Sequence, residues 1–337
     1  MAKPKITIIG LGTTGASMGL ALQKEEGNFV IVGHDRDPDA AREASRLHAV
    51  QRAEWNLHNA CDDADLIILA VPLSELGEIF SHIKEDVKPE TVIFATVNVL
   101  RPAIALAEQH FGPETHFVAG HPVLVGIGAP LSTRADLFDE VPFGLAPGVH
   151  TEPSAVQLAS DLIERMGAKP LFVDVDEHDG IVAATEQLPQ VMAIALMRLS
   201  THGAGWREAR RLAGRRFARA TETDASAAQL YGALTANRSA LLQRIDQLQT
   251  ELATWRELLD TLPPEQADVA QTKGDEGAKD PLLAALEDVV AARETWEAQA
   301  FLKRWEDAPT SAATEESKGM FRQMLFGNMM GGRRTKN

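Results

Sequence analysis

Short runs of consecutive apolar residues recur through the first half of the chain, and most of them are separated by stretches of helical character. Continuous apolar runs of about 4 to 8 residues are typical of strands that are buried on both faces. Strands that alternate with helices form a mostly parallel sheet covered on both sides. The pattern therefore predicts an α/β domain with a doubly wound sheet over residues 1–175. The predicted strands are 6–9, 29–34, 65–71, 91–95, 116–120, 143–146 and 171–175.

From Glu177 onward, apolar residues recur at helical spacing and no further strand pattern follows. This periodicity predicts an all-helical domain over residues 176–306. A stretch rich in Gln, Glu and Leu at 240–262 is shorter than the about three or four heptads that a coiled coil requires, so we interpret it as a core-facing helix, with a dimer interface as one location for it. The predicted helices are 181–199, 206–217, 230–262 and 281–306.

Polar segments lie on both sides of the last predicted helix. Residues 263–280, which contain Gly and Pro, and residues 307–318 have the composition of linkers or disordered loops. The tail, residues 307–337, ends in a stretch with several Met and Phe residues. Two interpretations of this stretch stay open: it caps a partner subunit, or it forms a short amphipathic helix on its own chain.

The sequence Gly10-Leu11-Gly12-Thr13-Thr14-Gly15 lies between the first predicted strand and an apolar helix. In this context the glycine spacing predicts a Rossmann-type domain that binds a dinucleotide. We expect Gly10 to make the tight turn, Gly12 to let the backbone approach a pyrophosphate, and Gly15 to let the helix pack closely on its strand. The pyrophosphate then lies at the helix N-terminus. The alternative is a merely structural glycine turn.

Asp35 lies 20 residues beyond Gly15, at the end of the second predicted strand. A carboxylate at this place accepts hydrogen bonds from the hydroxyls of the adenosine ribose and repels a 2′-phosphate. The predicted cofactor is therefore NAD, and NADP is the minority alternative. Arg36 is predicted to stack on adenine or to tolerate a 2′-phosphate, and a solvated side chain is the alternative for it.

Composition narrows the classes of partner. The 337 residues suffice for two hydrophobic cores, and the net charge of −15 argues against a nucleic-acid surface, which requires clustered Lys and Arg. The single cysteine, Cys61, has no internal disulfide partner, and the sequence has no zinc-ligand spacing of Cys and His. The first strand begins too early for a signal peptide, and no apolar run approaches the ~18 residues of a membrane span. We expect a cytoplasmic protein with a small-molecule substrate, without metal, membrane or nucleic acid.

Ligands of open α/β sheets lie beyond the carboxyl ends of the strands, so the residues that follow the predicted strands are candidates for chemistry. Three segments qualify: Ala70-Val71-Pro72, residues 95–99 with Thr96 and Asn98, and Gly120-His121-Pro122. A histidine at a strand end beside a nicotinamide is suited to accept a hydroxyl proton as hydride leaves. A packed or solvated histidine is the alternative. His178 is a weaker candidate, since the sequence Glu-His-Asp around it is also suited to capping a helix.

Several of these segments occur along the chain in the same order as the motifs of a known protein family. The chain resembles the prephenate/arogenate dehydrogenase family through about 240 residues, and the last 75 residues lie outside the resemblance. Each motif is common by itself, and their order is the specific feature. The matching segments are GlyLeuGlyThrThrGlyAlaSer (10–17), GlyHisAspArgAspPro (33–38), AlaAspLeuIleIleLeuAlaValProLeu (64–73), GlyHisPro (120–122), LeuPhe (137–138), GluHisAsp (177–179), LeuPro (188–189) and PheAlaArgAlaThrGluThrAsp (217–224).

The resemblance implies a nucleotide-binding domain followed by a helical dimerisation domain, and hence a homodimer. Enzymes of this family oxidise a cyclohexadienol with NAD and lose a carboxylate as CO2, which gives a phenol on the way to tyrosine. His121 matches the histidine that hydrogen-bonds the ring hydroxyl and assists its deprotonation. Arg219 matches the arginine that holds a substrate carboxylate, for which the planar fork of a guanidinium is suited.

The chain also departs from the family pattern at two places. Val99 stands where the family has a serine that contacts the ring hydroxyl, so Asn98 or Thr96 is expected to take over this contact. The family segment Ser-His-Leu-Pro-His reads Glu186-Gln187-Leu188-Pro189-Gln190 here, and we expect Gln187 and Gln190 to supply polar groups to the substrate. A ring-amino analogue of the family substrate is one way to accommodate these changes.

Two other functions remain open. A 3-hydroxyacid dehydrogenase or imine reductase also pairs this nucleotide domain with a helical domain, but those enzymes usually carry a lysine on the first interdomain helix. This chain has no lysine between Lys169 and Lys273. A nucleotide-binding protein that has lost catalysis and acts as a regulator is the other alternative.

Overall fold

The computed structural model describes residues 3–24, 29–124, 131–223, 225–262 and 280–302, and the structural statements below concern these residues. The chain forms two compact units, Met1–Gln247 and Leu248–Asn337. Most of the predicted linker at 263–280 and the whole predicted tail at 307–337 lie outside the described residues.

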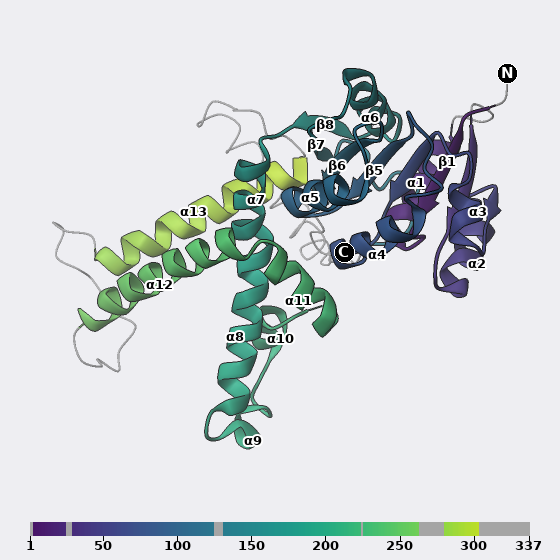
Figure 1. The fold of residues 1–337 in the computed structure, drawn as a ribbon. Helices are drawn as coiled ribbons and strands as arrows, with labels where there is room; N and C mark the ends of the chain where they lie inside the picture. The colour runs from purple at the N-terminus through teal and green to yellow at the C-terminus, as the bar shows by residue number, and fades with distance from the viewer. Residues whose placement is uncertain (1–2, 25–28, 125–130, 224, 263–279, 303–337) are drawn as a thin grey trace, which may run out of the picture. The chain divides into compact units, whose positions relative to one another are not determined.

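The first unit contains one eight-stranded sheet with the strand order β3-β2-β1-β4-β5-β6-β7-β8 (Figure 1). All neighbouring strands are parallel except β6 and β7, which pair in antiparallel register. The prediction of a mostly parallel, doubly wound sheet is therefore confirmed. The strands are β1 (Lys5–Ile9), β2 (Val30–His34), β3 (Arg52–Ala53), β4 (Leu66–Leu69), β5 (Val92–Thr96), β6 (His116–Pro122), β7 (Pro142–Pro147) and β8 (Lys169–Phe172).

Helices connect most of these strands and lie on both faces of the sheet (Figure 1). Their starts follow local sequence signals: Pro38 and Pro153 occupy the first turns of α2 and α6, where the missing N–H has no intrahelical partner in any case. The helices of this part are α1 (Thr13–Gln23), α2 (Pro38–Arg46), α3 (Leu57–Cys61), α4 (Leu73–Ile83), α5 (Leu100–His110) and α6 (Pro153–Arg165).

The described residues after β8 are helical, as the periodicity predicts. One continuous helical segment contains α7 (Val175–Val182), a π-helical turn η1 (Ala183–Gln187) and α8 (Leu188–His202). The remaining helices are α9 (Trp206–Ala209), α10 (Arg215–Ala220), α11 (Ala227–Ala236), α12 (Arg238–Asp260) and α13 (Pro281–Leu302).

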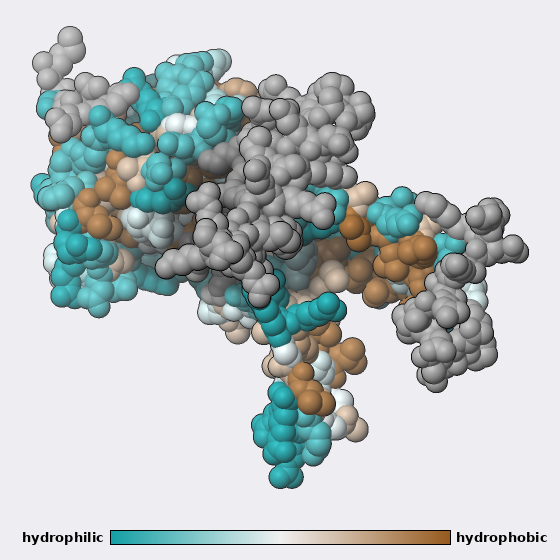
Figure 2. Space-filling model, turned by 180° about the vertical axis from the view of Figure 1, so that it is seen from behind, coloured by the Kyte–Doolittle hydropathy of each residue, from teal (hydrophilic) through white to brown (hydrophobic). Residues whose placement is uncertain are grey.

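The segment Val175–His202 is long enough and apolar enough to cross a membrane by length and composition alone, with a mean hydropathy of 1.3 in its most apolar window. The expectation that no apolar stretch approaches this length is therefore wrong for this segment. Long core helices of soluble proteins meet the same criterion. Several apolar side chains on it, among them Met192, Leu196 and Leu199, are exposed. Figure 2 shows apolar residues on the surface of the helical segments in brown.

Two predicted boundaries are wrong for local reasons. The predicted strand 171–175 ends at Phe172, because the side chain of Asp174 accepts hydrogen bonds from the N–H groups of Asp176 and Glu177 and starts α7. The predicted helix 206–217 is divided into α9 and α10, with Gly214 in an extended conformation at the start of α10. Glycine has a low helix propensity, which favours the break at this residue.

The predicted helix 230–262 is also divided. It starts earlier, at Ala227, because Ser226 and Gln229 form a capping box. It then breaks at Asn237, which has φ −118° and ψ 32°. The Asn237 side-chain amide donates to the carbonyl oxygen of Asp179 at 2.7 Å and to Oε1 of Gln187 at 3.0 Å. These buried tertiary hydrogen bonds outweigh the local preference for a continuous helix.

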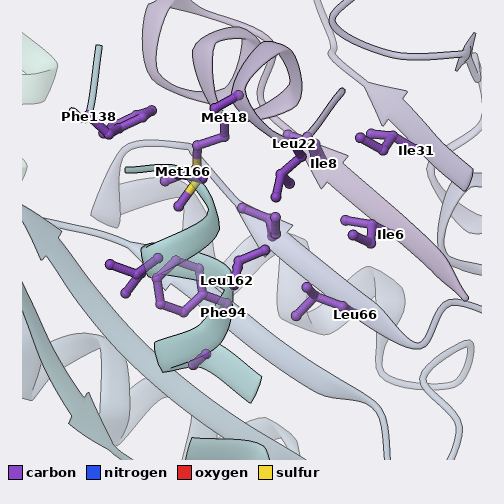
Figure 3. Close-up of a cluster of buried hydrophobic side chains, with 14 of the residues drawn as sticks. Ile6, Ile8, Met18, Leu22, Ile31, Leu66, Phe94, Phe138, Leu162 and Met166 are labelled. Carbon is purple, nitrogen blue, oxygen red and sulfur yellow. The ribbon is translucent and has the colours of Figure 1, made fainter. Parts of the chain in front are cut away.

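Two hydrophobic clusters cover the two faces of the sheet. Phe94 of β5 packs in the first cluster with Met18 of α1 and Leu162 of α6 (Figure 3). Its neighbour Ile93 packs in the second cluster with Phe80 of α4. Because successive side chains of a strand point to opposite faces and both faces are covered, the first four residues of β5, Val92 to Ala95, are all apolar. This double burial fixes the carboxyl ends of the central strands, from which the candidate site is built.

Candidate active site

The glycine turn after β1 has the geometry that its spacing predicts. Gly10 has φ +89°, a region that favours glycine, and a Cβ atom there would lie 2.4 Å from the carbonyl oxygen of Ala70. A Cβ on Gly15 would lie 1.9 Å from the carbonyl oxygen of Gly10, so α1 packs directly on the turn. Gly12 is different, because a Cβ there would meet no atom within 4 Å. The backbone at Gly12 therefore borders open space at the start of α1.

The open space is a cavity of about 660 Å³. The Asp35 carboxylate, at its wall, accepts hydrogen bonds from the N–H of Leu11 at 2.7 Å and from the N–H of Asp37 at 2.8 Å. Asp35 thus also holds the glycine turn in place. The guanidinium of Arg36 forms an ion pair with Glu75 at 2.8 Å. Predicted cofactor residues that line the cavity are Gly10, Gly12, Asp35, Arg36, Ala70, Val71 and Pro72.

Two further cavities, of about 510 and 280 Å³, adjoin the same strand ends. Val71 and Pro72, which follow β4, line all three cavities. Thr14 of α1 lines the 510 Å³ cavity, whereas Thr13, the first residue of α1, lines none of the three. Thr96, Asn98 and Glu186 line both smaller cavities, and His121 lines the 510 Å³ one. The structure therefore brings the predicted cofactor and catalytic segments to one region of the first unit.

His121 is buried at the end of β6 and belongs to a chain of hydrogen bonds. Its Nδ1 lies 3.0 Å from Nε2 of His178, and Nδ1 of His178 lies 3.0 Å from Oδ1 of Asp179. On the other side, Nε2 of His121 lies 3.1 Å from Oε1 of Glu186. The side-chain amide of Asn98 donates to Oε2 of Glu186 at 2.5 Å.

Asp179 anchors this chain of groups to the sheet domain. It is buried, and its two carboxylate oxygens accept hydrogen bonds from the N–H groups of Leu100 at 2.8 Å and Arg101 at 3.0 Å. These are the first two residues of α5, whose N-terminus carries a partial positive charge. Asp179 therefore caps α5, a helix far away in sequence.

Glu186 lies in the π-helical turn η1, and such turns are frequent at functional sites. Burial is the largest single influence on its carboxyl group and raises its pKa. The hydrogen bond and the charge of His121, with smaller contributions from Asn98 and His178, outweigh burial and hold the pKa of Glu186 below its ordinary value. Glu186 is thus stabilised as a carboxylate inside the site.

The other polar residues predicted for the site differ in whether their side chains already have hydrogen-bond partners within the protein. The Thr96 hydroxyl donates to the carbonyl oxygen of Leu69 at 3.1 Å. The Gln187 amide donates to the carbonyl oxygen of Ala233 at 2.8 Å and accepts from Asn237, so its polar groups hold the helices together. Among the described residues, Oε1 of Gln190 is buried and has no hydrogen-bond partner. Gln190 lines the 280 Å³ cavity and is the residue of this set with an acceptor to offer.

Arg219 lies in the last turn of α10, where it is exposed. It lines none of the three cavities described above. The described part of the chain has no group of three or more His, Cys, Asp or Glu side chains that is arranged to hold a metal ion. Cys61 is buried in the second hydrophobic cluster, away from this chemistry.

Together, the sheet, the glycine turn and the attached helices define a Rossmann-type nucleotide-binding protein with a second, helical part. Comparison with protein-family models narrows this class to one family. Residues 18–171 match the nucleotide-binding domain of prephenate dehydrogenase, and residues 174–269 match its dimerization domain. The chain therefore belongs to the prephenate dehydrogenase family, and the resemblance inferred from its motifs is confirmed.

Individual relatives agree with this assignment. The chain is 30% identical over 268 residues to a probable prephenate dehydrogenase, NovF, of Streptomyces niveus, covering 76% of this chain and 68% of the relative. It is 29% identical over 196 residues to the prephenate dehydrogenase of Lactococcus lactis, covering 57% and 53%. The chain thus spans between about half and two thirds of the length of its curated relatives.

A solved structure shows the same fold. The crystal structure of prephenate dehydrogenase from Aquifex aeolicus, in complex with hydroxyphenyl propionate and NAD+, superposes with a TM-score of 0.69. The sequence identity is 19%, and the match covers 87% of this chain and 98% of that one.

Sequence reasoning did not select Glu186, Asp179 or the contact between His121 and His178. The signal for Glu186 was its position in the segment that departs from the family pattern. The signal for His178 and Asp179 was present as well, in the motif that we interpreted as a possible helix cap.

Proposed function

We propose that this protein is an NAD-dependent dehydrogenase that oxidises a cyclohexadienyl acid with loss of CO2. Prephenate, which would give 4-hydroxyphenylpyruvate for tyrosine biosynthesis, is the leading substrate, and arogenate or a ring-amino analogue are the alternatives. Two observations together support the proposal. Both family models match the chain in order, and residues of the two matched regions line adjoining cavities.

The residues at the first cavity fit a dinucleotide. The open backbone at Gly12 and the free start of α1 suit a pyrophosphate, and Asp35 suits the hydroxyls of a ribose. Arg36 is engaged by Glu75, which supports NAD over NADP. NAD, when bound, supplies the hydride acceptor. Leu11, Thr13 and Thr14 are proposed to contact it from the turn.

The residues at the second region fit the chemistry of a ring hydroxyl. Oxidation of the ring carbon releases the hydroxyl proton, and the cluster around His121 is placed to receive it. Asn98 and Thr96 are proposed to orient the hydroxyl side of the ring. Gln190 is proposed to contact the substrate through its free oxygen, while Gln187 holds the wall of the site. The assignment of Arg219 to a substrate carboxylate rests on the family match alone.

We further propose that the protein is a cytoplasmic homodimer, with residues 176–306 as the substrate and dimerisation domain. The match to a dimerization-domain model supports the dimer. Exposed apolar side chains on α8 supply a surface for it, among them Met192, Leu196 and Leu199.

The test is the formation of NADH by the purified protein, followed by absorbance, with NAD or NADP and with prephenate or arogenate. The proposal predicts turnover with NAD and at least one of the two acids. Measurable NAD binding without turnover of either acid or of a ring-amino analogue would contradict the proposal and would favour a nucleotide-binding regulator.

A further inference from the structure

The hydrogen bonds of His121 raise the question of which atom receives the substrate proton. Both ring nitrogens of His121 already have partners inside the cluster, His178 at Nδ1 and Glu186 at Nε2. An imidazole has only these two nitrogens, and each makes one hydrogen bond in the ring plane. In this arrangement His121 has no free lone pair to offer to a ligand in the cavity.

Two carboxylates end this chain of contacts, Asp179 beyond His178 and Glu186 beside His121. An ionised carboxylate only accepts hydrogen bonds and is able to take up a proton.

Of the two carboxylates, only that of Glu186 lines the cavities. Asp179 is buried and uses both oxygens on the N-terminus of α5. The Glu186 side chain is 32% exposed, whereas that of His121 is 6% exposed. Glu186 also borders both smaller cavities, beside Asn98 and Thr96. A ligand that enters the site therefore meets the Glu186 carboxylate before it meets the imidazole of His121.

We propose that Glu186 is the catalytic base of this enzyme and that His121 positions it. This inference rests on the proposed function. The O–H bond of the substrate ring breaks and its proton forms a new O–H bond on the Glu186 carboxylate. The ring carbon loses hydride to the dinucleotide, and the bond to the substrate carboxylate breaks to release CO2, whose electron pair completes the aromatic ring. The ring oxygen is left as a phenolate, Glu186 returns its proton to that oxygen, and the product is a phenol.

The π-helical turn explains how Glu186 reaches this position. A residue inserted into a helix shifts the side chains that follow around the helix axis. In η1, Glu186 faces His121 and Asn98 while Gln187 faces Ala233 and Asn237. The carboxylate thus takes part in the site, and the neighbouring amide secures the helix that carries it.

The experiment compares Glu186→Gln with Glu186→Ala in the full-length protein. Glutamine keeps the shape and can accept a hydrogen bond from His121, but it cannot take a proton. Because a positioned general base contributes about 10²–10⁴-fold, we expect Glu186→Gln to lower kcat by at least about 100-fold with little change in the affinity for NAD. Glu177→Gln, which removes an exposed carboxylate from the preceding helix, is the matched control and should retain wild-type activity.

Added formate distinguishes a base from a merely structural carboxylate. Formate should restore part of the activity of Glu186→Ala, whereas nitrate, a planar anion of negligible basicity, should restore none. Glu186→Gln activity within about threefold of wild type would overturn the inference, as would a Glu186→Ala enzyme that formate and nitrate affect equally. In that case His121 itself takes the proton. A wild-type protein that turns over no cyclohexadienyl acid would instead overturn the proposed function, and the role of Glu186 with it.

Discussion

Asp179 links the hydrogen-bonded cluster of His121, His178 and Glu186 to the sheet domain, and its removal tests this link quantitatively. In Asp179→Ala the N–H groups of Leu100 and Arg101 lose their acceptor, and Nδ1 of His178 loses its partner. A buried polar group without a partner costs about 1–3 kcal/mol. A carboxylate at a helix N-terminus adds about 0.3–2 kcal/mol. Since the Arg101 N–H is only partly buried, we expect the free energy of unfolding to fall by about 3 to 5 kcal/mol.

The assay is urea unfolding at neutral pH, followed by circular dichroism, with the free-energy difference taken from midpoint and slope. Asp176→Ala is the matched control, because Asp176 lies on the same helix and forms an exposed ion pair with Arg101. An exposed pair of this kind contributes at most about 1 kcal/mol. If Asp179→Ala were no more destabilising than Asp176→Ala, the cap on α5 would not stabilise the fold and the reasoning would be wrong.

Three further predictions follow from single sites. Gly15→Ala should abolish measurable NAD binding in a calorimetric titration, because its Cβ would lie 1.9 Å from the carbonyl oxygen of Gly10. The pKa of Glu186 is lower in the folded protein than its ordinary value of 4.5, so its ionised carboxylate stabilises the fold at pH values above 4.5. This stabilisation is lost as the pH falls through the lower pKa of the folded protein. The stability difference between wild type and Glu186→Gln, measured by urea unfolding, should therefore shrink below that pH. Burial raises the pKa of the Cys61 thiol to about 12, so the folded protein should not react with a thiol reagent until it is unfolded.

The parts of the molecule that depend on local sequence were predictable. The apolar runs of β1, β4 and β5 mark buried strands because each strand is covered on both faces. The glycine turn was predictable for a related reason: its geometry depends on a few adjacent residues, and the backbone at Gly10 and Gly15 excludes other side chains.

The cluster around His121 was not predictable in the same way, because it depends on contacts between distant segments. His178 reaches His121 across 57 positions, and Asp179 reaches Leu100 across 79. Glu186 enters the site through a π-helical turn, for which helical periodicity gives no signal. The break at Asn237 has a similar origin, since its hydrogen bonds to Asp179 and Gln187 exist only in the folded chain.

The chain combines a nucleotide-binding turn of the usual kind with segments that depart from the family pattern at Val99 and at residues 186–190. The Val99 side chain is buried at the start of α5 and offers no hydrogen bond, so under the proposed function polar contact with a ring hydroxyl is assigned to Glu186, Asn98 or Thr96, which line the 510 Å³ cavity. A carboxylate also binds an amine well, and a ring-amino acid therefore belongs among the substrates to offer beside prephenate and arogenate.

The central claim is that this protein couples hydride transfer to loss of CO2. The most direct test measures NADH and CO2 together, from carboxyl-labelled prephenate or arogenate and NAD. The account predicts that the two products form in equal amounts and that a phenol accumulates with them. NADH without CO2 would indicate a simple hydroxyacid dehydrogenase, and neither product from any cyclohexadienyl acid would contradict the account.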